Sequence, residues 1–287
     1  MTRKSYRVKF LGGDGSSMLA GIIDRPENSS AANSPANLPV DHRPSGEVEN
    51  WPVVVFSHCF TCNKDLKSTV RIARALADRG IAVLRFDMTG LGGSQGDFSQ
   101  SNFSTNLADL SAAIRFATDE LGPVGGLLGH SFGGAASLAI ASQASSDGLQ
   151  PIRAVVSLAA PSDTTHLADL LSSMNPAIQR EGFGKVTIGG LEWTIRREML
   201  DDFRNHDLPK RISEINCPVL LLHSPVDKTV RFDHALRIMS LINSSSSLEA
   251  SVSLASLSEA DHLLAGNPAD IQYVASLASA FFRRFCA

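Results

Sequence analysis

Short apolar runs alternate with amphipathic stretches through most of the chain after Trp51. A continuous apolar run is typical of a strand buried on both faces, and such runs occur at 53–56, 81–84, 124–128, 154–158 and 219–222. A further strand is expected at 251–257. Helical patterns separate them, over 68–79, 106–120, from Ala135, 232–242 and 270–285. Repeated strand and helix units predict an α/β fold: a mainly parallel, twisted sheet of about eight strands with helices on both faces. Ligands bind such sheets at the carboxyl ends of the strands.

The N-terminal segment has a different pattern. Apolar and polar residues alternate over 6–11 and 18–23, on either side of Gly12-Gly13-Asp14-Gly15, which predicts an antiparallel hairpin. From 25 to 50 the chain is rich in Pro, Ser, Asn and charged residues and has no apolar period. We expect this stretch to be an exposed polar loop.

One connection is much longer than the others. About fifty residues separate the strand that ends near Ala160 from the strand that begins near Cys217, whereas such connections are usually short. Within it, apolar residues alternate around Gly189-Gly190, as a tight hairpin with a primed turn requires: Val186, Ile188, Leu191, Trp193 and Ile195. We expect residues of about 162–215 to form a small lid inserted into a single domain that spans 1–287.

Composition and charge narrow the possible partners. The 287 residues carry a net charge of −3 and no clear basic patch, so neither nucleic acid nor a membrane is an expected partner. No apolar run approaches the roughly 18 residues of a membrane span, and the N-terminus reads as a strand rather than a signal peptide. We therefore expect a cytoplasmic protein whose partner is a small molecule, and the pattern specifies no oligomer.

The cysteines are too few for a disulfide framework in a chain that can build its own core, so we expect four free thiols: Cys59, Cys62, Cys217 and Cys286. Cys59 and Cys62 have the C-x-x-C spacing that also occurs in redox motifs and zinc sites. No second cysteine pair completes a zinc site, and a thioredoxin-type motif needs its own small fold. Neither alternative is favoured.

The pentapeptide Gly129-His130-Ser131-Phe132-Gly133 follows an apolar strand and precedes a small-residue helix. A sharp strand-to-helix turn leaves no room for side chains at its flanks, which explains the two glycines, and it projects the serine hydroxyl above the sheet edge. This pattern is typical of a nucleophile elbow, and it makes Ser131 the candidate nucleophile. The alternative is an ordinary glycine-rich turn that binds nothing.

A nucleophilic serine needs a base to take its proton and a carboxylate to hold that base in one tautomer. In folds with such an elbow the acid precedes the histidine, and each lies on a loop at a strand end. Asp227 follows the strand at 219–222 and His262 follows the strand at 251–257, so they are the candidates. Asp163 and Asp233 are alternatives for the acid, and an exposed loop histidine is the alternative for His262.

Two backbone N–H groups are also needed to bind the oxyanion, one after the nucleophile and one in the loop after the third strand. Phe132 provides the first, and Phe60 in the loop 57–62 is the candidate for the second. The substrate pocket is predicted from Cys59, His130, Phe183 and Trp193. This chemistry needs no cofactor and no metal. The glycine-rich stretch 87–94 is expected to shape the wall of the site, because it lacks the Lys of a phosphate-binding loop.

Six segments together resemble one family: 58–65, 86–98, 129–134, 160–163, 223–227 and 260–264. It is the α/β-hydrolase module often found joined to an OsmC-like peroxide-handling domain, and the string His58-Cys59-Phe60-Thr61-Cys62 is its most specific part. The resemblance covers nearly the whole chain from Trp51. It implies an α/β-hydrolase fold and the triad assigned above. No OsmC-like domain follows the last predicted helix, so the resemblance does not imply peroxide chemistry for this chain.

The combined pattern predicts a serine carboxylesterase that cleaves small esters through an acyl-enzyme. The same triad would serve a thioesterase, a peptidase or a perhydrolase. From a different class, the chain could be a non-catalytic binding module or a partner of an OsmC-like peroxide-handling protein. A third hypothesis, a redox protein that uses Cys59 and Cys62, predicts thiol-dependent peroxide consumption that survives loss of Ser131.

Overall fold

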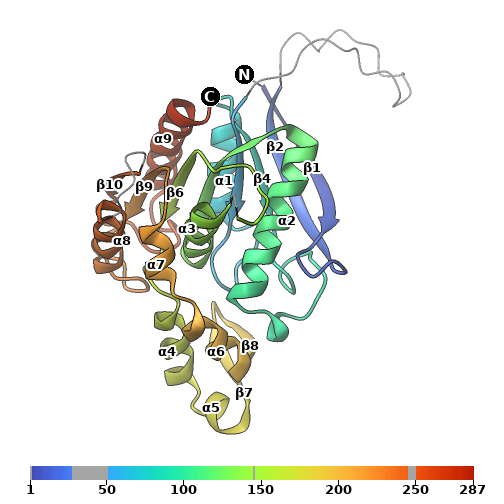
Figure 1. The fold of residues 1–287 in the computed structure, drawn as a ribbon, viewed down its shortest axis with the longest axis vertical. Coiled ribbons are helices and arrows are strands. Elements are labelled where there is room, and N and C mark those ends of the chain that lie inside the picture. Colours follow the sequence, from blue (N-terminus) through green and yellow to red (C-terminus); the bar gives the residue numbers. More distant parts are fainter. Residues whose placement is uncertain (1, 28–50, 145, 245–249) are drawn as a thin grey trace.

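The computed structural model describes residues 2–27, 51–144, 146–244 and 250–287, and its centre is a twisted eight-stranded sheet (Figure 1). In spatial order the strands are β1 (Thr2–Leu11), β2 (Met18–Glu27), β4 (Ala82–Phe86), β3 (Val53–Ser57), β5 (Val124–His130), β6 (Ala154–Leu158), β9 (Pro218–His223) and β10 (Ser251–Ser256). The pairs β1–β2 and β2–β4 are antiparallel, and all the others are parallel. The predicted α/β fold is confirmed.

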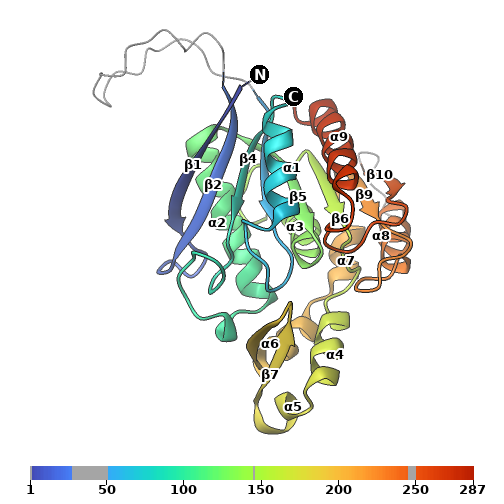
Figure 2. The same cartoon turned by 180° about the vertical axis from the view of Figure 1, so that it is seen from behind.

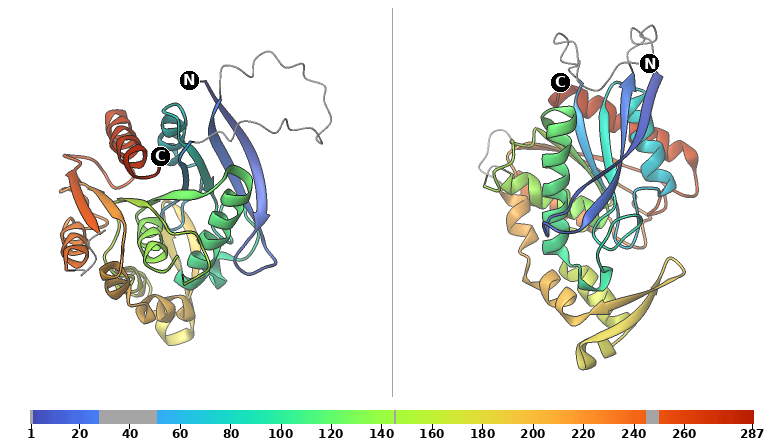
Figure 3. Two further views of the ribbon diagram at one scale, coloured as in Figure 1. Left: turned by 45° about the horizontal axis from the view of Figure 1, so that its top comes forward. Right: turned by 90° about the vertical axis from the view of Figure 1, so that its right-hand side faces the viewer.

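Helices cover both faces of the sheet (Figures 2 and 3). On one face α1 (Lys67–Ala77) packs against α9 (Pro268–Phe285), and the other face carries α2 (Phe103–Leu121), α3 (Phe132–Gln143), α7 (Leu208–Ser213) and α8 (Asp233–Asn243). Successive residues of a strand point to opposite faces, so Val53 and Val55 join one apolar core while Val54 and Phe56 join the other. This two-sided burial is why the central strands are continuous apolar runs.

The N-terminal hairpin is longer than the apolar pattern indicated. Strand β2 runs to Glu27, and Arg25 and Pro26 pair with Lys4 and Arg3 in the antiparallel ladder. The prediction that the polar loop begins at Arg25 was therefore wrong by three residues. Backbone hydrogen bonds to β1 can extend a strand without apolar side chains, so the polar composition gave no sign of it. The remaining loop residues, 28–50, lie outside the described residues.

The long connection between β6 and β9 lies at the carboxyl ends of the parallel strands (Figure 1). It contains α4 (Thr165–Met174), α5 (Ala177–Glu181), β7 (Phe183–Ile188), β8 (Leu191–Arg196) and α6 (Arg197–Asn205) before α7. The predicted hairpin is confirmed, since β7 and β8 pair across Gly189 and Gly190, whose φ angles of 60° and 78° suit a type I′ turn. Strand β8 contacts the short 3₁₀ helix η2 (Phe98–Gln100) of the main domain.

No helix within the described ranges is long and apolar enough to cross a membrane.

Candidate active site

Ser131 occupies the turn between β5 and α3 at the carboxyl edge of the sheet. Its φ of 55° is unusual for a residue with a side chain, and its N–H donates to the carbonyl of Leu158 on the neighbouring strand at 2.7 Å. A Cβ at Gly129 would overlap the backbone of Gly133, and one at Gly133 would overlap the carbonyl oxygens of Ser57 and His58. Both glycines are therefore required for α3 to begin this close to the sheet.

Ser131, His262 and Asp227 form a continuous hydrogen-bonded chain although they are far apart in the sequence. The distance from Ser131 Oγ to His262 Nε2 is 2.9 Å, and from His262 Nδ1 to Asp227 Oδ2 it is 2.7 Å. A carboxylate only accepts, so Nδ1 carries the proton and Nε2 is left to accept from the serine hydroxyl. Ser131 and Asp227 are buried and His262 is half-buried.

The two alternative acids, Asp163 and Asp233, interact with residues other than His262. Asp163 accepts hydrogen bonds from the backbone N–H of His166 and from Arg237, and Asp233 pairs with Arg231. Asp227 is also held by the loop it belongs to, since its second oxygen accepts from the N–H groups of 229 and 230 at 2.8 and 3.0 Å. Of the three carboxylates, it is Asp227 that contacts His262.

The electrostatic environment keeps Asp227 ionised. Burial opposes its charge, but the hydrogen bonds from His262, Val230 and Thr229 outweigh burial and lower its pKa. The buried His223, at the end of β9, donates from Nε2 to the carbonyl of Val230 at 2.8 Å and so closes the Asp227 loop. Burial lowers the pKa of His223, which keeps this donor neutral.

The two candidate oxyanion donors meet at one small cavity. Phe132 is the first residue of α3, where a backbone N–H has no partner within the helix, and Phe60 lies in the loop after β3. Both residues line the cavity, and their rings are 5.5 Å apart. The rest of its lining is mostly apolar and includes Met88, Leu91, Phe98 and Ala136.

Known proteins match both the sequence and this architecture. The family described as the alpha/beta hydrolase fold matches residues 52–216. The esterase domain of a Rhodothermus marinus protein is 30% identical, with 99% of this chain and 100% of that chain covered and a TM-score of 0.68. The chain belongs to the α/β-hydrolase family. It is a hydrolase, as its sequence predicted.

More distant structures share the fold of the hydrolase. Est1E from Butyrivibrio proteoclasticus with ferulic acid bound is 19% identical, with 97% of this chain and 99% of that chain covered and a TM-score of 0.69. The α/β hydrolase GrgF from Penicillium sp. sh18 is 16% identical, with 99% of each chain covered and a TM-score of 0.72. No curated protein sequence matches the hydrolase significantly.

The predicted free thiols at Cys59 and Cys62 are corrected by the structure of the hydrolase. The two cysteines form a disulfide, with Cα atoms 5.3 Å apart, whereas Cys217 and Cys286 are free and buried. The loop turns back on itself between them, because the N–H of Cys62 donates to the carbonyl of Cys59 at 3.1 Å. The turn brings the two sulfur atoms within bonding distance, which the cysteine count did not indicate.

Of the four predicted pocket residues, Cys59 lines the cavity and the other three do not. His130 is buried behind Ser131, and Phe183 points outward from β7 with 57% of its surface exposed. Trp193 lies one layer further out, with its ring 4.8 Å from that of Phe98. Alternation along a hairpin fixes which residues share a face, but only the docking of the hairpin decides which face meets the site.

His130 contacts the loop of His262 instead of the cavity. Its Nε2 lies 2.7 Å from the carbonyl oxygen of His262, and because a carbonyl only accepts, His130 is the donor. Burial lowers the pKa of His130 to about 3, so it stays neutral. Sequence reasoning missed both His130 and His223 as anchors, although each is the one polar residue that ends an apolar strand.

This burial predicts an acid-sensitive fold. Below the unfolded pKa of about 6.5, the unfolded chain binds a proton at His130 that the folded chain excludes until about pH 3. The free energy of unfolding therefore falls as pH falls, by about 2 kcal/mol between pH 6.5 and 5 from this group. Urea unfolding at pH 7.5 and 5 should show a smaller pH effect in His130→Gln. An equal loss in both proteins would contradict the assignment.

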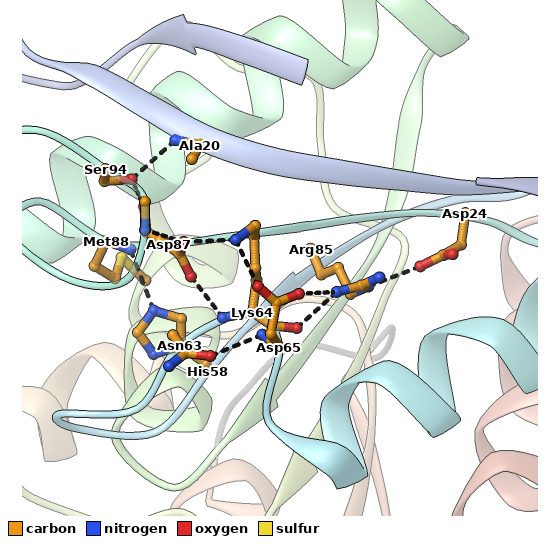
Figure 4. A network of polar contacts seen from close by, with 11 residues as sticks. Ala20, Asp24, His58, Asn63, Lys64, Asp65, Arg85, Asp87, Met88 and Ser94 are labelled. Carbon is orange, nitrogen blue, oxygen red and sulfur yellow. Dashed lines mark hydrogen bonds and ion pairs between the residues drawn. The ribbon is translucent and has the colours of Figure 1, made fainter. Parts of the chain in front are cut away.

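A buried ion network fixes the loop that carries Phe60 (Figure 4). Asp87 accepts from the backbone N–H of Lys64 at 2.6 Å, from its ammonium at 2.9 Å and from the N–H of Gly93 at 2.8 Å. Arg85 bonds Asp24 at 2.8 Å and Asp65 at 3.0 Å. The stretch 87–94 is thus bonded to this loop, and its residues Met88 and Leu91 line the cavity, in agreement with the expected role in the wall of the site. The sequence analysis did not predict the ion network.

The network predicts a large stability difference between two aspartates. The Asp87 side chain is fully buried and its loss leaves the Lys64 ammonium without its buried partner, so Asp87→Ala should lower the free energy of unfolding by about 3–5 kcal/mol. Asp169 pairs with Arg204 at the surface with 66% of its side chain exposed, and Asp169→Ala should cost less than about 1 kcal/mol. Urea denaturation of both variants measures the contrast. Similar losses would refute it.

Proposed function

We propose that the hydrolase is a carboxylesterase that cleaves small esters with Ser131 as nucleophile, His262 as general base and Asp227 as the group that orients the histidine. The observation that carries the proposal is the hydrogen-bonded chain from Ser131 Oγ through His262 to Asp227, with distances of 2.9 and 2.7 Å. A hydroxyl becomes an effective nucleophile only beside such an oriented base.

The reaction has two steps. Ser131 Oγ attacks the ester carbonyl while His262 Nε2 takes its proton, and the tetrahedral oxyanion accepts hydrogen bonds from the N–H groups of Phe132 and Phe60. Collapse expels the alcohol, which receives the proton from His262. Water, deprotonated by His262, then attacks the acyl-enzyme, and the carboxylic acid and free Ser131 are released. No cofactor is consumed in either step.

The substrate class rests on the surroundings of the two proposed oxyanion donors. The residues that pack around them are mostly apolar, which favours an uncharged, apolar acyl group over a charged one. The Rhodothermus marinus relative is named an esterase. We further propose that the chain works as a single domain, in which residues of about 162–215 act as a lid over the carboxyl edge.

A fluorophosphonate probe tests the proposal directly. It should form one covalent adduct, which peptide mass spectrometry locates on Ser131, and a short-chain p-nitrophenyl ester should compete with labelling. Thioester, peptide and ester substrates compared at equal concentration then rank the leaving groups. Absence of the adduct from Ser131 would favour a non-catalytic binding module, and an adduct with faster thioester or peptide cleavage would replace the carboxylesterase assignment.

A further inference from the structure

We propose that the Cys59–Cys62 disulfide is a site of thiol–disulfide exchange, through which a dithiol reductant lowers the turnover of the hydrolase. The inference rests on the proposed function, because Phe60, the proposed oxyanion donor, lies between the two cysteines. The bond therefore closes a ring of four residues, 59–62, that includes Phe60.

The ring holds Thr61 in an unfavourable backbone conformation. Cys59 and Cys62 are the first and last residues of a turn, and Thr61 has a φ of 59°. Turns with positive φ at the third position normally use Gly or Asn there, because a β-branched side chain clashes with the backbone. Such a conformation persists only where surrounding bonds impose it, and here the disulfide spans the turn. Reduction removes that constraint, and we expect the Phe60 N–H to move.

The change stays local because both ends of the ring are fixed independently. His58 Nδ1 donates to the carbonyl of Cys59 at 2.8 Å, and its Nε2 accepts from the N–H of Met88 at 3.2 Å. On the other side the N–H of Lys64 is bound by buried Asp87. Figure 4 shows the contact of His58 with Met88 and that of Lys64 with Asp87. The sheet, Ser131 and His262 do not depend on the disulfide.

The two cysteines differ in solvent exposure, and this decides which sulfur atom the reductant attacks. Cys59 is 3% exposed, whereas Cys62 is half-buried. A thiolate of the reductant attacks Cys62 Sγ, the S–S bond breaks, and Cys59 leaves as a thiolate that takes up a proton. The second thiol of the reductant then attacks the first sulfur of the reductant, which is bonded to Cys62 Sγ in the mixed disulfide. This step releases Cys62 as a thiol. The reductant is oxidised to its disulfide and the hydrolase gains two electrons and two protons.

The other two cysteines do not compete in this chemistry. Cys217 and Cys286 are buried, and burial raises the pKa of each to about 12. Few thiolates form there at neutral pH, and the thiolate is the reactive species. They serve as internal controls for the exchange.

The test compares the oxidised protein with protein reduced by dithiothreitol, with thiols counted by alkylation and peptide mass. Reduction should expose thiols at Cys59 and Cys62 and lower kcat for a p-nitrophenyl ester by about 10²–10³-fold, the usual effect of losing one oxyanion donor. KM should change little, and reoxidation should restore kcat. Cys62→Ala should have the low kcat permanently and ignore the reductant, while Cys286→Ala should respond like the natural chain.

The outcomes separate this inference from the proposed function. An unchanged kcat after complete reduction, or no bond between Cys59 and Cys62 under oxidising conditions, overturns the exchange site. Far-ultraviolet circular dichroism must stay unchanged on reduction, because loss of the fold would also overturn a local mechanism. Fluorophosphonate labelling of the oxidised protein tests the proposed function separately. If Ser131 is labelled and the protein is active, but its kcat does not respond to the reductant, only the present inference fails.

Discussion

Replacing Ser131 by alanine should lower kcat for an activated short-chain ester by about four to six powers of ten, with little change in stability. The hydroxyl is the one group of the proposed triad that bonds to the substrate, so no neighbouring atom can take its place. Its Oγ lies 2.9 Å from His262 Nε2, and the elbow backbone is held by Gly129, Gly133 and the bond to Leu158. Steady-state rates, together with urea unfolding, measure both parts of the expectation.

Ser137 provides a matched control for this substitution. It is a buried serine in the second turn of α3, the helix that follows Ser131, and its hydroxyl donates to the carbonyl of Gly133 at 2.9 Å. Ser137→Ala removes the same kind of atom, a buried serine hydroxyl, six residues further along the chain and should leave kcat within a few-fold of the natural value. Retained turnover in Ser131→Ala, with a folded chain, would remove the acyl-enzyme mechanism.

Asp227→Asn should lower kcat by about four powers of ten while the position of His262 is kept. The carboxylate accepts the Nδ1 proton at 2.7 Å, and this leaves Nε2 free to take the proton of Ser131. An asparagine amide can donate to Nδ1, which places the ring proton on Nε2 and removes the base. The measurement is kcat near neutral pH, with fluorophosphonate labelling slowed in proportion.

The alternative acids are the controls for Asp227. Asp163→Asn disturbs a bond to Arg237, and Asp233→Asn disturbs one to Arg231, and neither side chain contacts His262. Both variants should keep kcat within a few-fold. A loss in Asp163→Asn as large as in Asp227→Asn would mean that the acid in solution differs from the one in the structure.

Local rules explain why so much of the candidate site was predictable. Backbone crowding at the elbow admits only glycine at 129 and 133, so the motif carries its geometry with it. The carboxyl ends of parallel strands share one edge, and this places the loops after β5, β9 and β10 at the same edge of the sheet. Ser131, His262 and Asp227 follow from these two facts and their order in the chain.

Contacts between distant segments were not predictable in the same way. The ring of His130 was expected in the substrate pocket, yet it bonds a carbonyl 132 residues away. Asp87 accepts from Lys64 in the loop after β3 and from Gly93 in the glycine-rich bend. No residue pattern specifies the backbone conformation of these two segments. A polar residue in an apolar strand signals that some partner exists, but not which one.

By itself the sequence determined the α/β architecture, the hairpins, the elbow and the identity of three candidate catalytic residues, because periodicity and backbone sterics act over a few residues. The tertiary structure alone decided that Cys59 and Cys62 are bonded, that β2 continues to Glu27, that Phe183 faces solvent, and that buried histidines tie the loops of the site together. These outcomes depend on where a backbone turns and which face docks, and both are set by packing across the whole molecule.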